Sequence, residues 1–410
     1  MSSLEIKSSL NDFVPPPRIT GRYEDTTAGG ETVSAFIPIP LPPEPPLVMP
    51  SNSHFFLLFS DTNNKLSRMD ALVEQLPSIP LFLAPYLERE AVLSSQIEGT
   101  QSSLDDLLMG ETYSEGESML DITETSNYLE ALNHGIEKLN EGFPLTLRLM
   151  CEVHQILMRR GRGSNKQPGE FRRSQNWIGG TRPGNAVFVP PPPQHLMDCM
   201  GELEKFIQQE NSFNPNLNPM PPLLRAALAH LQFETIHPFL DGNGRLGRML
   251  ISLILYDAKI LHQPCLYLSL FFKQNRDEYY RLLNRVRLDG NWELWVEFFL
   301  TGVAHTAQHG TDLAHKLLKI VAIDEARIRS SVGSNRNVLR LHQYLQSRPL
   351  VSVTRASKEI GISFPTASKA FEKLVSLGLV RERTGKLRDR FFEYTDYFAL
   401  LAEDTEPLPR

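Results

Sequence analysis

Cysteine is scarce in this sequence, which has only Cys151, Cys199 and Cys265 among its 410 residues. An odd number of widely spaced cysteines suits neither a disulfide framework nor a zinc cluster. We therefore expect all three to be reduced residues that serve in packing.

Long hydrophobic runs are missing too. The longest apolar stretch, Met249–Leu261, is broken by Asp257 and Lys259 and is too short to span a bilayer. The first residues, Met1–Asn11, carry no basic segment followed by an apolar one and a cleavage site, so no secretory signal is predicted. These absences predict a cytosolic protein with no membrane contact.

Positive charge is in the minority, and the formal net charge is −6. This balance argues against a protein wholly devoted to nucleic acid. From Gly333 to Tyr394, however, twelve Lys and Arg residues stand against five Asp and Glu. Such a basic segment within an acidic chain indicates a separate module.

Apolar residues recur three and four apart over most of the chain from Asn64 onward, which predicts helices. The first 50 residues are instead rich in proline and have no useful helical or strand period, so we expect an extended or partly ordered arm there. We predict a mainly α protein in five segments: a proline-rich arm at 1–50, an N-terminal helical region at 51–118, a helical core at 119–310, a helical linker at 311–332 and a winged helix-turn-helix at 333–400.

One segment, Phe171–Pro193, departs from the helical pattern of the core. Two short strand-like pieces flank a cluster of Gly, Pro and Asn, and a run of prolines follows the second piece. This arrangement predicts a β-hairpin.

The most informative residues are HPFLDGNGRLGR, from His237 to Arg248. Pro238 disfavours helix at the residue before it, so the preceding apolar helix should end near Ile236 and a loop should begin at the histidine. Gly242 and Gly244 allow left-handed backbone, which lets successive N–H groups converge on an anion. The helix that follows points its N-terminus at the same place.

Charged side chains complete this loop. Arg245 and Arg248 are three apart on the following helix and so offer two guanidinium groups on one face. Asp241 is a hard oxygen ligand, suited to Mg²⁺ that bridges phosphates. Because histidine titrates near neutrality, His237 can take a proton from an attacking hydroxyl. The loop therefore holds all the parts of a nucleotidyl transfer.

Each of these features alone has an ordinary explanation. A histidine before a proline is usually structural, a Gly-Asn-Gly sequence is usually a turn, and two arginines on a helix are usually solvated. Their combination at fixed spacing has no evident structural need and favours a functional site.

The residues His237–Arg248 resemble the complete Fic motif, His-x-Phe-x-Asp/Glu-Gly-Asn-Gly-Arg-x-x-Arg, with every defining position filled. The resemblance implies a Fic-type helical bundle with a β-hairpin flap. It implies an enzyme that uses Mg²⁺ and transfers AMP from ATP to a hydroxyl of a protein, itself included. Gly244 matches the AMP-transferring branch, because the phosphotransferase branch that resembles Doc toxins has a lysine there.

The resemblance also implies roles for single residues. His237 would be the general base and Asp241 the Mg²⁺ ligand. The residues expected to bind nucleotide within the motif are His237, Pro238, Phe239, Asp241, Gly242, Asn243, Gly244, Arg245 and Arg248.

A second resemblance lies upstream, where Ser94-Ser95-Gln96-Ile97-Glu98-Gly99 is similar to the inhibitory motif Ser/Thr-x-x-x-Glu-Gly/Asn of Fic proteins that restrain themselves. Ser94 and Glu98 are four apart and would share one face of a helix. The resemblance implies that Glu98 pairs with Arg248 and forces ATP into an unreactive pose. An exposed N-terminal helix is the alternative explanation of Glu98.

Three further expectations come from the resemblance. Gly180–Pro190 would be the flap that aligns a target segment by backbone pairing, with a plain surface hairpin as the alternative. Tyr279 would lie beside adenine, although a pair such as Tyr279 and Tyr280 is more often core or interface. Gln232, about one turn before His237, could also reach the nucleotide.

In the basic segment, Ser363 is expected to cap a recognition helix, Phe364–Leu377, that stops at Gly378. DNA contact is one interpretation of this module. A protein-binding or dimerising winged helix is the other, because the helix shows few side chains suited to base edges. The basic residues of the helix and wing are Lys369, Lys373, Arg381, Arg383, Lys386, Arg388 and Arg390.

Two other functions stay open at this point. The protein could be a transcriptional regulator in which the Fic fold only senses nucleotide, although an intact His237 argues for catalysis. It could also remove AMP from a modified protein, with Glu98 positioning a water. A homodimer is the default that the family suggests.

Overall fold

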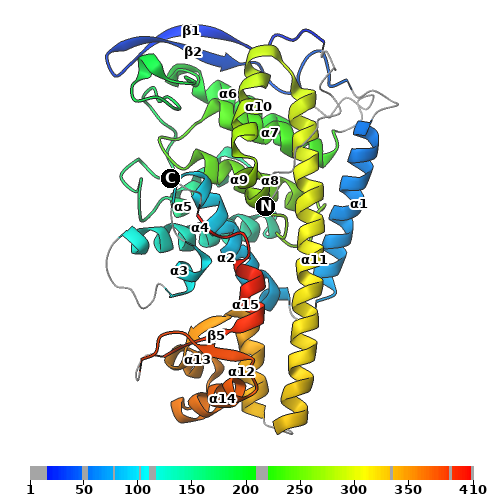
Figure 1. The fold of residues 1–410 in the computed structure, drawn as a ribbon. Coiled ribbons are helices and arrows are strands. Elements are labelled where there is room, and N and C mark those ends of the chain that lie inside the picture. Colours follow the sequence, from blue (N-terminus) through cyan, green and yellow to red (C-terminus); the bar gives the residue numbers. More distant parts are fainter. Residues whose placement is uncertain are drawn as a thin grey trace. The chain divides into compact units, whose positions relative to one another are not determined.

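The computed structural model describes residues 16–48, 54–76, 79–100, 103–109, 117–208, 220–332, 336–386 and 390–407. These residues are mainly helical, as predicted, with short strands (Figure 1). By its internal contacts the chain divides into two compact units: unit 1 comprises Met1–Ser67 and Asn127–Ala307, and unit 2 comprises Arg68–Ser126 and Gln308–Arg410. Both units therefore combine an early and a late stretch of the chain. The five predicted segments stay a prediction.

Unit 1 contains a β-hairpin, most of its helices and the predicted loop. Its elements are β1 (Gly21–Ala28), β2 (Glu31–Pro38), the first part of α1 (His54–Glu74), most of α4 (Glu117–Asn140), α5 (Leu147–Leu157), the 3₁₀ turn η1 (Pro183–Asn185), α6 (Pro193–Gln208), α7 (Pro222–Ile236), α8 (Asn243–Asp257), α9 (Ser269–Gln274), α10 (Arg276–Asp289) and the first part of α11 (Trp292–Val332).

The N-terminal arm, expected to be extended or partly ordered, contains a regular β-hairpin that was not predicted from the sequence. Strands β1 and β2 pair antiparallel from Gly21 opposite Pro38 to Ala28 opposite Glu31. Gly29 and Gly30 both have positive φ, 55° and 84°, at the tight turn between them. Two glycines in that conformation match the right-handed twist of a two-residue hairpin. The Gly29–Gly30 turn is a local signal for a hairpin, but the proline-rich composition around it favoured an irregular arm.

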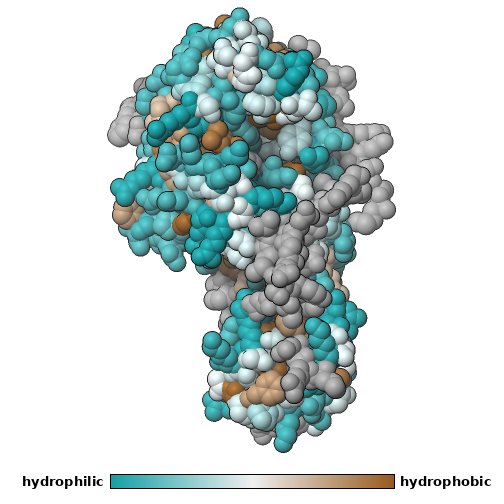
Figure 2. Space-filling model, turned by 90° about the vertical axis from the view of Figure 1, so that its left-hand side faces the viewer, coloured by the Kyte–Doolittle hydropathy of each residue, from teal (hydrophilic) through white to brown (hydrophobic). Residues whose placement is uncertain are grey.

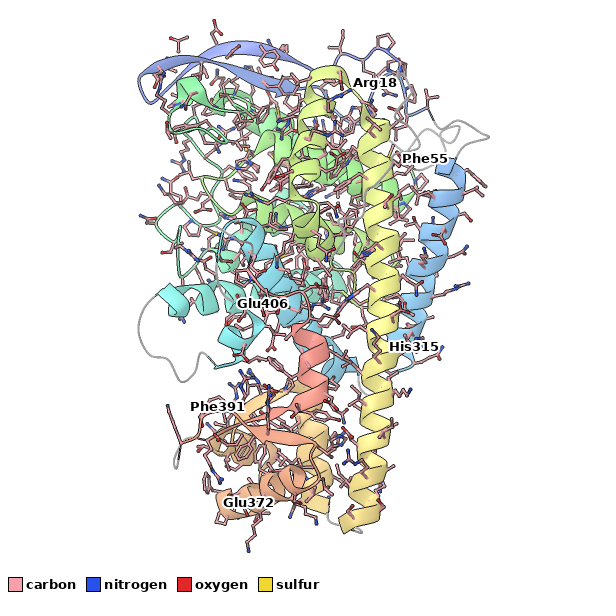
Figure 3. All side chains as sticks on the ribbon, viewed as in Figure 1. Arg18, Phe55, His315, Glu372, Phe391 and Glu406 are labelled. Carbon is pink, nitrogen blue, oxygen red and sulfur yellow. The ribbon has the colours of Figure 1, made fainter. Side chains whose placement is uncertain are left out.

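Arg18 fixes the proline-rich segment that follows the hairpin (Figure 3). Its guanidinium forms a buried ion pair with Glu293 on α11, at 2.7 Å. It also donates to the carbonyls of Pro45 and Pro46, at 2.6 and 2.7 Å. A guanidinium can serve several acceptors because it carries five donors in a fixed plane. One arginine therefore orders a segment that has no regular structure of its own.

Helix α7 is the central helix of unit 1. All of its residues from Leu223 to Ile236 are buried, and it packs against α6 and α8. A helix that is buried all round needs neighbours on all sides. Trp295 of α11 adds one such contact, because its indole N–H donates to the Ala227 carbonyl at 2.9 Å. The loop after α7 therefore starts from a fixed support.

Unit 2 combines the upstream helices with the C-terminal segment. Its elements are the end of α1, α2 (Ile79–Ile97), α3 (Leu104–Met109), the start of α4, the rest of α11, α12 (Arg336–Ser347), β3 (Leu350–Ser352), α13 (Val353–Ile360), α14 (Phe364–Ser376), β4 (Val380–Glu382), β5 (Phe391–Tyr394) and α15 (Thr395–Ala402). The three strands form an antiparallel sheet in the order β3-β5-β4.

The ends of α14 lie where the sequence places them. The Ser363 hydroxyl accepts from the Thr366 N–H, and Gly378 after the helix has a positive φ of 70°. Gly361, between α13 and α14, is left-handed as well, with φ 69°. Short-range capping chemistry was enough to predict these boundaries. Arg388 of the predicted wing lies outside the described residues.

Helix α2, which carries the upstream motif, packs within unit 2 against α12 and α15. The segment after α15 adds two hydrogen bonds to it. Gln96 donates to the Thr405 carbonyl, and Arg89 donates to the Glu403 carbonyl, both at 2.8 Å. This helix is therefore part of the same folded unit as the C-terminal segment.

Helix α11 runs without a break for 41 residues, from Trp292 to Val332. The predicted linker at 311–332 is helical, but it continues the last helix of the predicted core. Within unit 2, the later part of α11 is held by Tyr394, whose hydroxyl donates to Asp324 at 2.8 Å.

The surface has ordinary properties. Hydrophilic residues predominate on the face drawn in Figure 2, with apolar residues in small groups. Among the described residues, no helix has both the length and the apolarity that crossing a membrane requires.

The three cysteines are free thiols, as expected, and burial raises the pKa of Cys151 and Cys199 to about 11.

Glu88 on α2 gives a test of the packing in unit 2. Burial raises its pKa to about 7, against the opposing charges of Arg348 and Arg355. The folded state therefore keeps a proton that the unfolded chain releases above its ordinary value of 4.5. Stability should fall as pH rises from about 4.5 to about 7, by about 3 kcal/mol in total.

We expect Glu88→Gln to remove this loss, since glutamine does not titrate. Urea unfolding at pH 5 and at pH 8 measures the effect, and Glu372→Gln, an exposed site on α14 (Figure 3), is the control. The Glu88→Gln protein should be the more stable of the two at pH 8. The same loss of stability between pH 5 and pH 8 in both variants would contradict the burial of an ionisable Glu88.

Candidate active site

The predicted loop begins where the sequence places it. Helix α7 ends at Ile236, and His237 follows as its C-cap, in the left-handed region with φ 50° and ψ 61°. The His237 N–H still bonds to the Phe233 carbonyl, at 2.9 Å. A left-handed residue other than glycine is uncommon and costs energy, so the surroundings must hold it in place.

Arg172 supplies much of that support. Its guanidinium is buried and donates to the His237 carbonyl at 2.9 Å and to the Pro191 carbonyl at 2.6 Å. Its own backbone N–H donates to the Pro238 carbonyl at 2.9 Å. Burial lowers the pKa of Arg172 to about 10, which still leaves the side chain charged at neutral pH. One side chain thus joins the start of the loop to the segment before α6.

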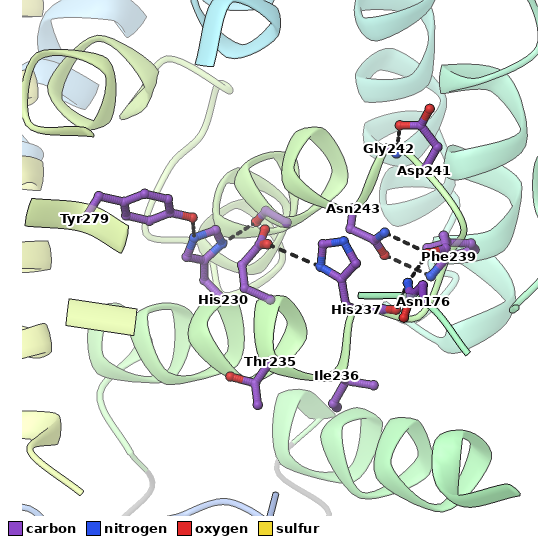
Figure 4. A network of polar contacts seen from close by, with 12 residues as sticks. Asn176, His230, Thr235, Ile236, His237, Phe239, Asp241, Gly242, Asn243 and Tyr279 are labelled. Carbon is purple, nitrogen blue, oxygen red and sulfur yellow. Dashed lines mark hydrogen bonds and ion pairs between the residues drawn. The ribbon is translucent and has the colours of Figure 1, made fainter. Parts of the chain in front are cut away.

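Asn243 closes the loop from the other end, at the first residue of α8 (Figure 4). Its Oδ1 accepts from the Phe239 N–H and its Nδ2 donates to the Phe239 carbonyl, both at 2.8 Å. Asn176 donates to the same carbonyl at 3.2 Å. The buried Asn243 side chain therefore shapes the loop. Its role in binding nucleotide stays a prediction.

His154 on α5 holds the middle of the loop. Its Nδ1 accepts from the Gly169 N–H, so its Nε2 carries the proton that it donates to the Asp241 carbonyl at 2.9 Å. Its ring stacks on Phe239, with centroids 3.7 Å apart. Burial lowers the pKa of His154 to about 4, so this histidine is neutral at physiological pH.

The Asp241 carboxylate is partly exposed to solvent. Its side chain is 43% exposed. Its Oδ1 accepts from the Gly242 N–H at 2.6 Å, and the Arg245 guanidinium lies 3.7 Å away. Among the described residues, no group of three or more His, Cys, Asp and Glu side chains could hold a metal ion. Any cation bound here would depend on ligands from a substrate or from water.

Helix α8 starts at the loop with a left-handed N-cap, Gly242, at φ 76°, and no side chain caps it there. Its first turn therefore points backbone N–H groups and a positive dipole end at the loop. Arg245 and Arg248 are both buried on this helix. These features are those of an anion-binding site.

Two residues that the sequence did not indicate, one on α7 and one on α10, lie at the end of α7 that leads to His237. Glu234, one turn before His237, has its Oε2 3.9 Å from the His237 Nδ1. Arg287 on α10 donates to the Thr235 hydroxyl at 3.1 Å, and its guanidinium stacks over the Phe188 ring at 3.8 Å. Arg287 thus connects the end of α7 with the predicted flap.

The structure places Tyr279 and Gln232 inside the fold. Tyr279 is 1% exposed, and its hydroxyl lies 2.9 Å from Nε2 of the buried His230 (Figure 4). Gln232 is also buried and donates to the Ile39 carbonyl after β2 at 2.8 Å. For Tyr279 the structure favours the core alternative, because its ring stacks on Phe272.

The predicted hairpin is only partly formed. Ile178 and Phe188 make an isolated antiparallel bridge, and the 3₁₀ turn η1 lies between them. Gly179 and Gly180 have positive φ, 67° and 72°, which breaks the first strand. The second piece reaches β2 through one bond, from the Phe36 N–H to the Val189 carbonyl at 2.9 Å. The role of Gly180–Pro190 as a flap stays a prediction.

The upstream motif belongs to unit 2, whereas the loop belongs to unit 1. Ser94 is buried within α2, and Glu98 follows its last residue. Gly99, with φ 97°, donates to the Gln96 carbonyl, and Thr100 donates to the Ser95 carbonyl. This pair of bonds is a Schellman cap, which explains why glycine follows the glutamate. The pairing of Glu98 with Arg248 stays a prediction.

Of the supporting residues that sequence reasoning missed, only His154 leaves a local signal. It is a lone histidine on the buried face of α5, beside Val153 and Leu157. Nothing in the sequence separates Arg172, which is buried, from its neighbour Arg173, whose side chain is 83% exposed. Such roles depend on partners far away in the chain.

Comparisons with known proteins agree on one family. A family model described as "Fic/DOC family" matches residues 144–255, and one described as "Fic/DOC family N-terminal" matches residues 57–137. A protein adenylyltransferase Fic from Culex quinquefasciatus is 31% identical over 189 residues, which cover 46% of this chain and 33% of that protein. One from Drosophila mojavensis is 33% identical over 154 residues, 38% of this chain and 26% of the relative. The chain thus spans about a third or less of the length of these relatives.

A solved structure shows the likeness of the fold. The crystal structure of a Fic family protein from Desulfovibrio desulfuricans has a TM-score of 0.54 with this chain, at 20% identity. The match covers 86% of this chain and 98% of that one.

Asn243→Ala tests the two hydrogen bonds by which the Asn243 side chain holds the loop at Phe239. The change leaves the buried Phe239 N–H without its acceptor, so we expect a loss of about 2 kcal/mol in the free energy of unfolding. Asn243→Asp keeps the acceptor but sets a buried carboxylate oxygen against the Phe239 carbonyl, so it should be destabilising as well. Thermal unfolding of the wild type and the two variants measures these losses. An alanine variant as stable as the wild type would show that the Asn243 side chain does not hold the loop.

Proposed function

Because residues 57–137 and 144–255 belong to the Fic/DOC family, we propose that the protein transfers AMP from ATP to a Ser, Thr or Tyr hydroxyl of a protein. The observation that carries the proposal is the loop itself. His237 is held left-handed at the end of α7, and the same short loop leads to the uncapped N-terminus of α8. A base and an anion-binding helix end are thus fixed together by one continuous stretch of chain.

The proposed reaction joins the hydroxyl oxygen of the target to the α-phosphorus of ATP. The bond from that phosphorus to the bridging oxygen of the β-phosphate breaks, and pyrophosphate leaves. His237 accepts the hydroxyl proton. The helix N-terminus and the arginines of α8 stabilise the negative charge on the phosphates, because their donors are already in place.

A magnesium ion fits the donors at Asp241. Mg²⁺ in nucleotide sites commonly uses one or two carboxylates together with substrate phosphates and water. The partly exposed Asp241 offers one such carboxylate, and the bound ion would neutralise phosphate charge. The main contribution of the chain is to hold Asp241, through the bonds from His154 and Gly242.

The C-terminal segment 333–400 supports the protein-binding alternative better than DNA contact. Its helices and sheet have the order of a winged helix-turn-helix, which we propose it to be. The exposed face of α14 carries Phe364 and Val375, 52% and 41% exposed. Two of the wing arginines, Arg381 and Arg383, form ion pairs with the buried Glu393. Their charge is therefore less available to a phosphate backbone.

Two further expectations stay predictions, namely a cytosolic location and the homodimer that the family suggests. Nucleotide sensing without catalysis and removal of AMP remain alternatives. Incubation of the purified protein with ATP labelled on the α-phosphate, in the presence of Mg²⁺, separates them, because only the transferase labels protein.

His237→Ala should abolish labelling while folding and ATP binding persist. The histidine accepts a proton only in the transition state, and removal of a general base typically costs about 10²- to 10⁴-fold in rate. His134→Ala, a partly exposed site on α4, is the control. Equal labelling rates for His237→Ala and the wild type would show that the proposed mechanism is wrong.

Glu98→Gln should raise the labelling rate, if Glu98 occupies the Arg248 guanidinium that the γ-phosphate needs. Glutamine keeps the size of the side chain and leaves Gly99 to form its cap, and Glu98→Gly should act in the same direction. Arg248→Ala should lower the rate, and adding a Glu98 change to it should restore little. Two results of a labelling time course would contradict inhibition by Glu98 through Arg248. In one, neither Glu98 variant labels faster than the wild type. In the other, the gain in labelling rate persists in the Arg248→Ala background.

A further inference from the structure

Glu234 lies one turn before His237 on α7, where its side chain is 9% exposed. Its Oε2 is 3.9 Å from the His237 Nδ1. A carboxylate this deeply buried needs a partner of opposite charge or a donor. The distance is longer than a hydrogen bond, but such contacts commonly tighten only when substrate binds.

The position of the Glu234 carboxylate is set by its neighbours. Gly247 on α8 leaves room for it, because a Cβ at position 247 would lie 2.3 Å from the Glu234 Oε1. Arg287 fixes the backbone of the same turn, donating to the Glu234 carbonyl at 3.4 Å and to the Thr235 hydroxyl at 3.1 Å. The glycine lies within the Leu-Gly-Arg end of the loop motif, at a position where the motif itself allows any residue.

We propose that Glu234 is a positioning residue for His237, which turns the imidazole so that Nδ1 faces Glu234 and Nε2 is left to accept the hydroxyl proton. A carboxylate beside one ring nitrogen selects the tautomer that carries its proton there. It also stabilises the imidazolium that forms when the other nitrogen takes a proton. This inference rests on the proposed function, in which His237 is the base.

Other charges act on the same pair. The Arg172 guanidinium, at the His237 carbonyl, opposes protonation of the imidazole. The buried Arg287 guanidinium interacts electrostatically with the Glu234 carboxylate. Asp241 and Arg245 form their own pair on the far side of the loop. Of these groups, Glu234 is the one whose charge favours the protonated histidine at short range.

Two variants displace the carboxylate in different ways. Glu234→Gln removes the charge and keeps the shape. Gly247→Ala keeps the charge and pushes the end of the flexible side chain away, and alanine is the better residue for a helix. Glu278→Gln on α10 removes one negative charge at an exposed ion pair with Arg281, and it is the matched control.

The first measurement is an NMR titration of the full-length protein with labelled histidine, without nucleotide or magnesium. The His237 signal is identified by its loss in His237→Ala. We expect the His237 titration midpoint to fall by about one pH unit in Glu234→Gln, since an opposite charge within about 4–6 Å shifts a pKa by roughly 1–3 units. A smaller fall is expected in Gly247→Ala and none in Glu278→Gln.

The second measurement is the rate of protein labelling as a function of pH and of ATP concentration. Both displaced variants should lose roughly 10- to 100-fold in kcat, with little change in KM for ATP, because orientation of the base is lost and nucleotide binding is not. The acid limb of the pH profile should move to lower pH by the same interval as the NMR midpoint. A purely structural role for Glu234 would lower activity without moving this limb.

The two measurements separate failure of this inference from failure of the proposed function. An unchanged His237 midpoint in both displaced variants, or an equal shift in Glu278→Gln, overturns the role of Glu234 whatever the activity. If the His237 midpoint shifts as expected in the variants but the wild type never labels protein, the contact is upheld and the proposed function is refuted.

Discussion

The candidate site depends most on the hydrogen bonds that the buried Arg172 guanidinium makes to backbone carbonyls. Arg172 carries a full positive charge into the interior, where its hydrogen-bond acceptors are backbone carbonyls, those of His237, Pro191, Ile236 and Ser174. Two of these belong to the end of α7, where the helix dipole is negative, so the charge is compensated by the fold itself. A lysine could not replace it, because one ammonium group lacks the fixed planar fork of a guanidinium. The left-handed His237 and the segment before α6 are held by the same side chain.

Local chemistry explains what the sequence could predict. Pro238 ends α7, so the start of the loop was predicted correctly, and the glycines around Asn243 shape the turn into α8. Ser363 and Gly378 set the ends of α14 in the same way. Each of these signals acts within a few residues of where it is read.

Long-range partners explain what the sequence could not predict. Arg172 and Glu234 act on the loop from outside it, and nothing in their neighbourhoods marks them. His154 shows only as a lone histidine on the buried face of α5. The β1–β2 hairpin was missed for a different reason, because its Gly29–Gly30 turn is a local signal that the surrounding prolines outweighed. In the partly formed hairpin the alternating residues are present, but the left-handed Gly179 and Gly180 interrupt the pairing.

The unbroken helix α11 limits how this protein can be divided for laboratory use. At about 1.5 Å per residue, its 41 residues extend for roughly 60 Å, and a cut at any interior point leaves carbonyl groups without partners. A chain ended near residue 310, after the predicted core, would also lack α12 and α15, on which α2 packs. Such a fragment would expose apolar surface of the helix that carries Glu98. Any change measured in this fragment would then reflect a disturbed α2 as much as the removal of the C-terminal segment, so point substitutions in the whole chain are the cleaner test.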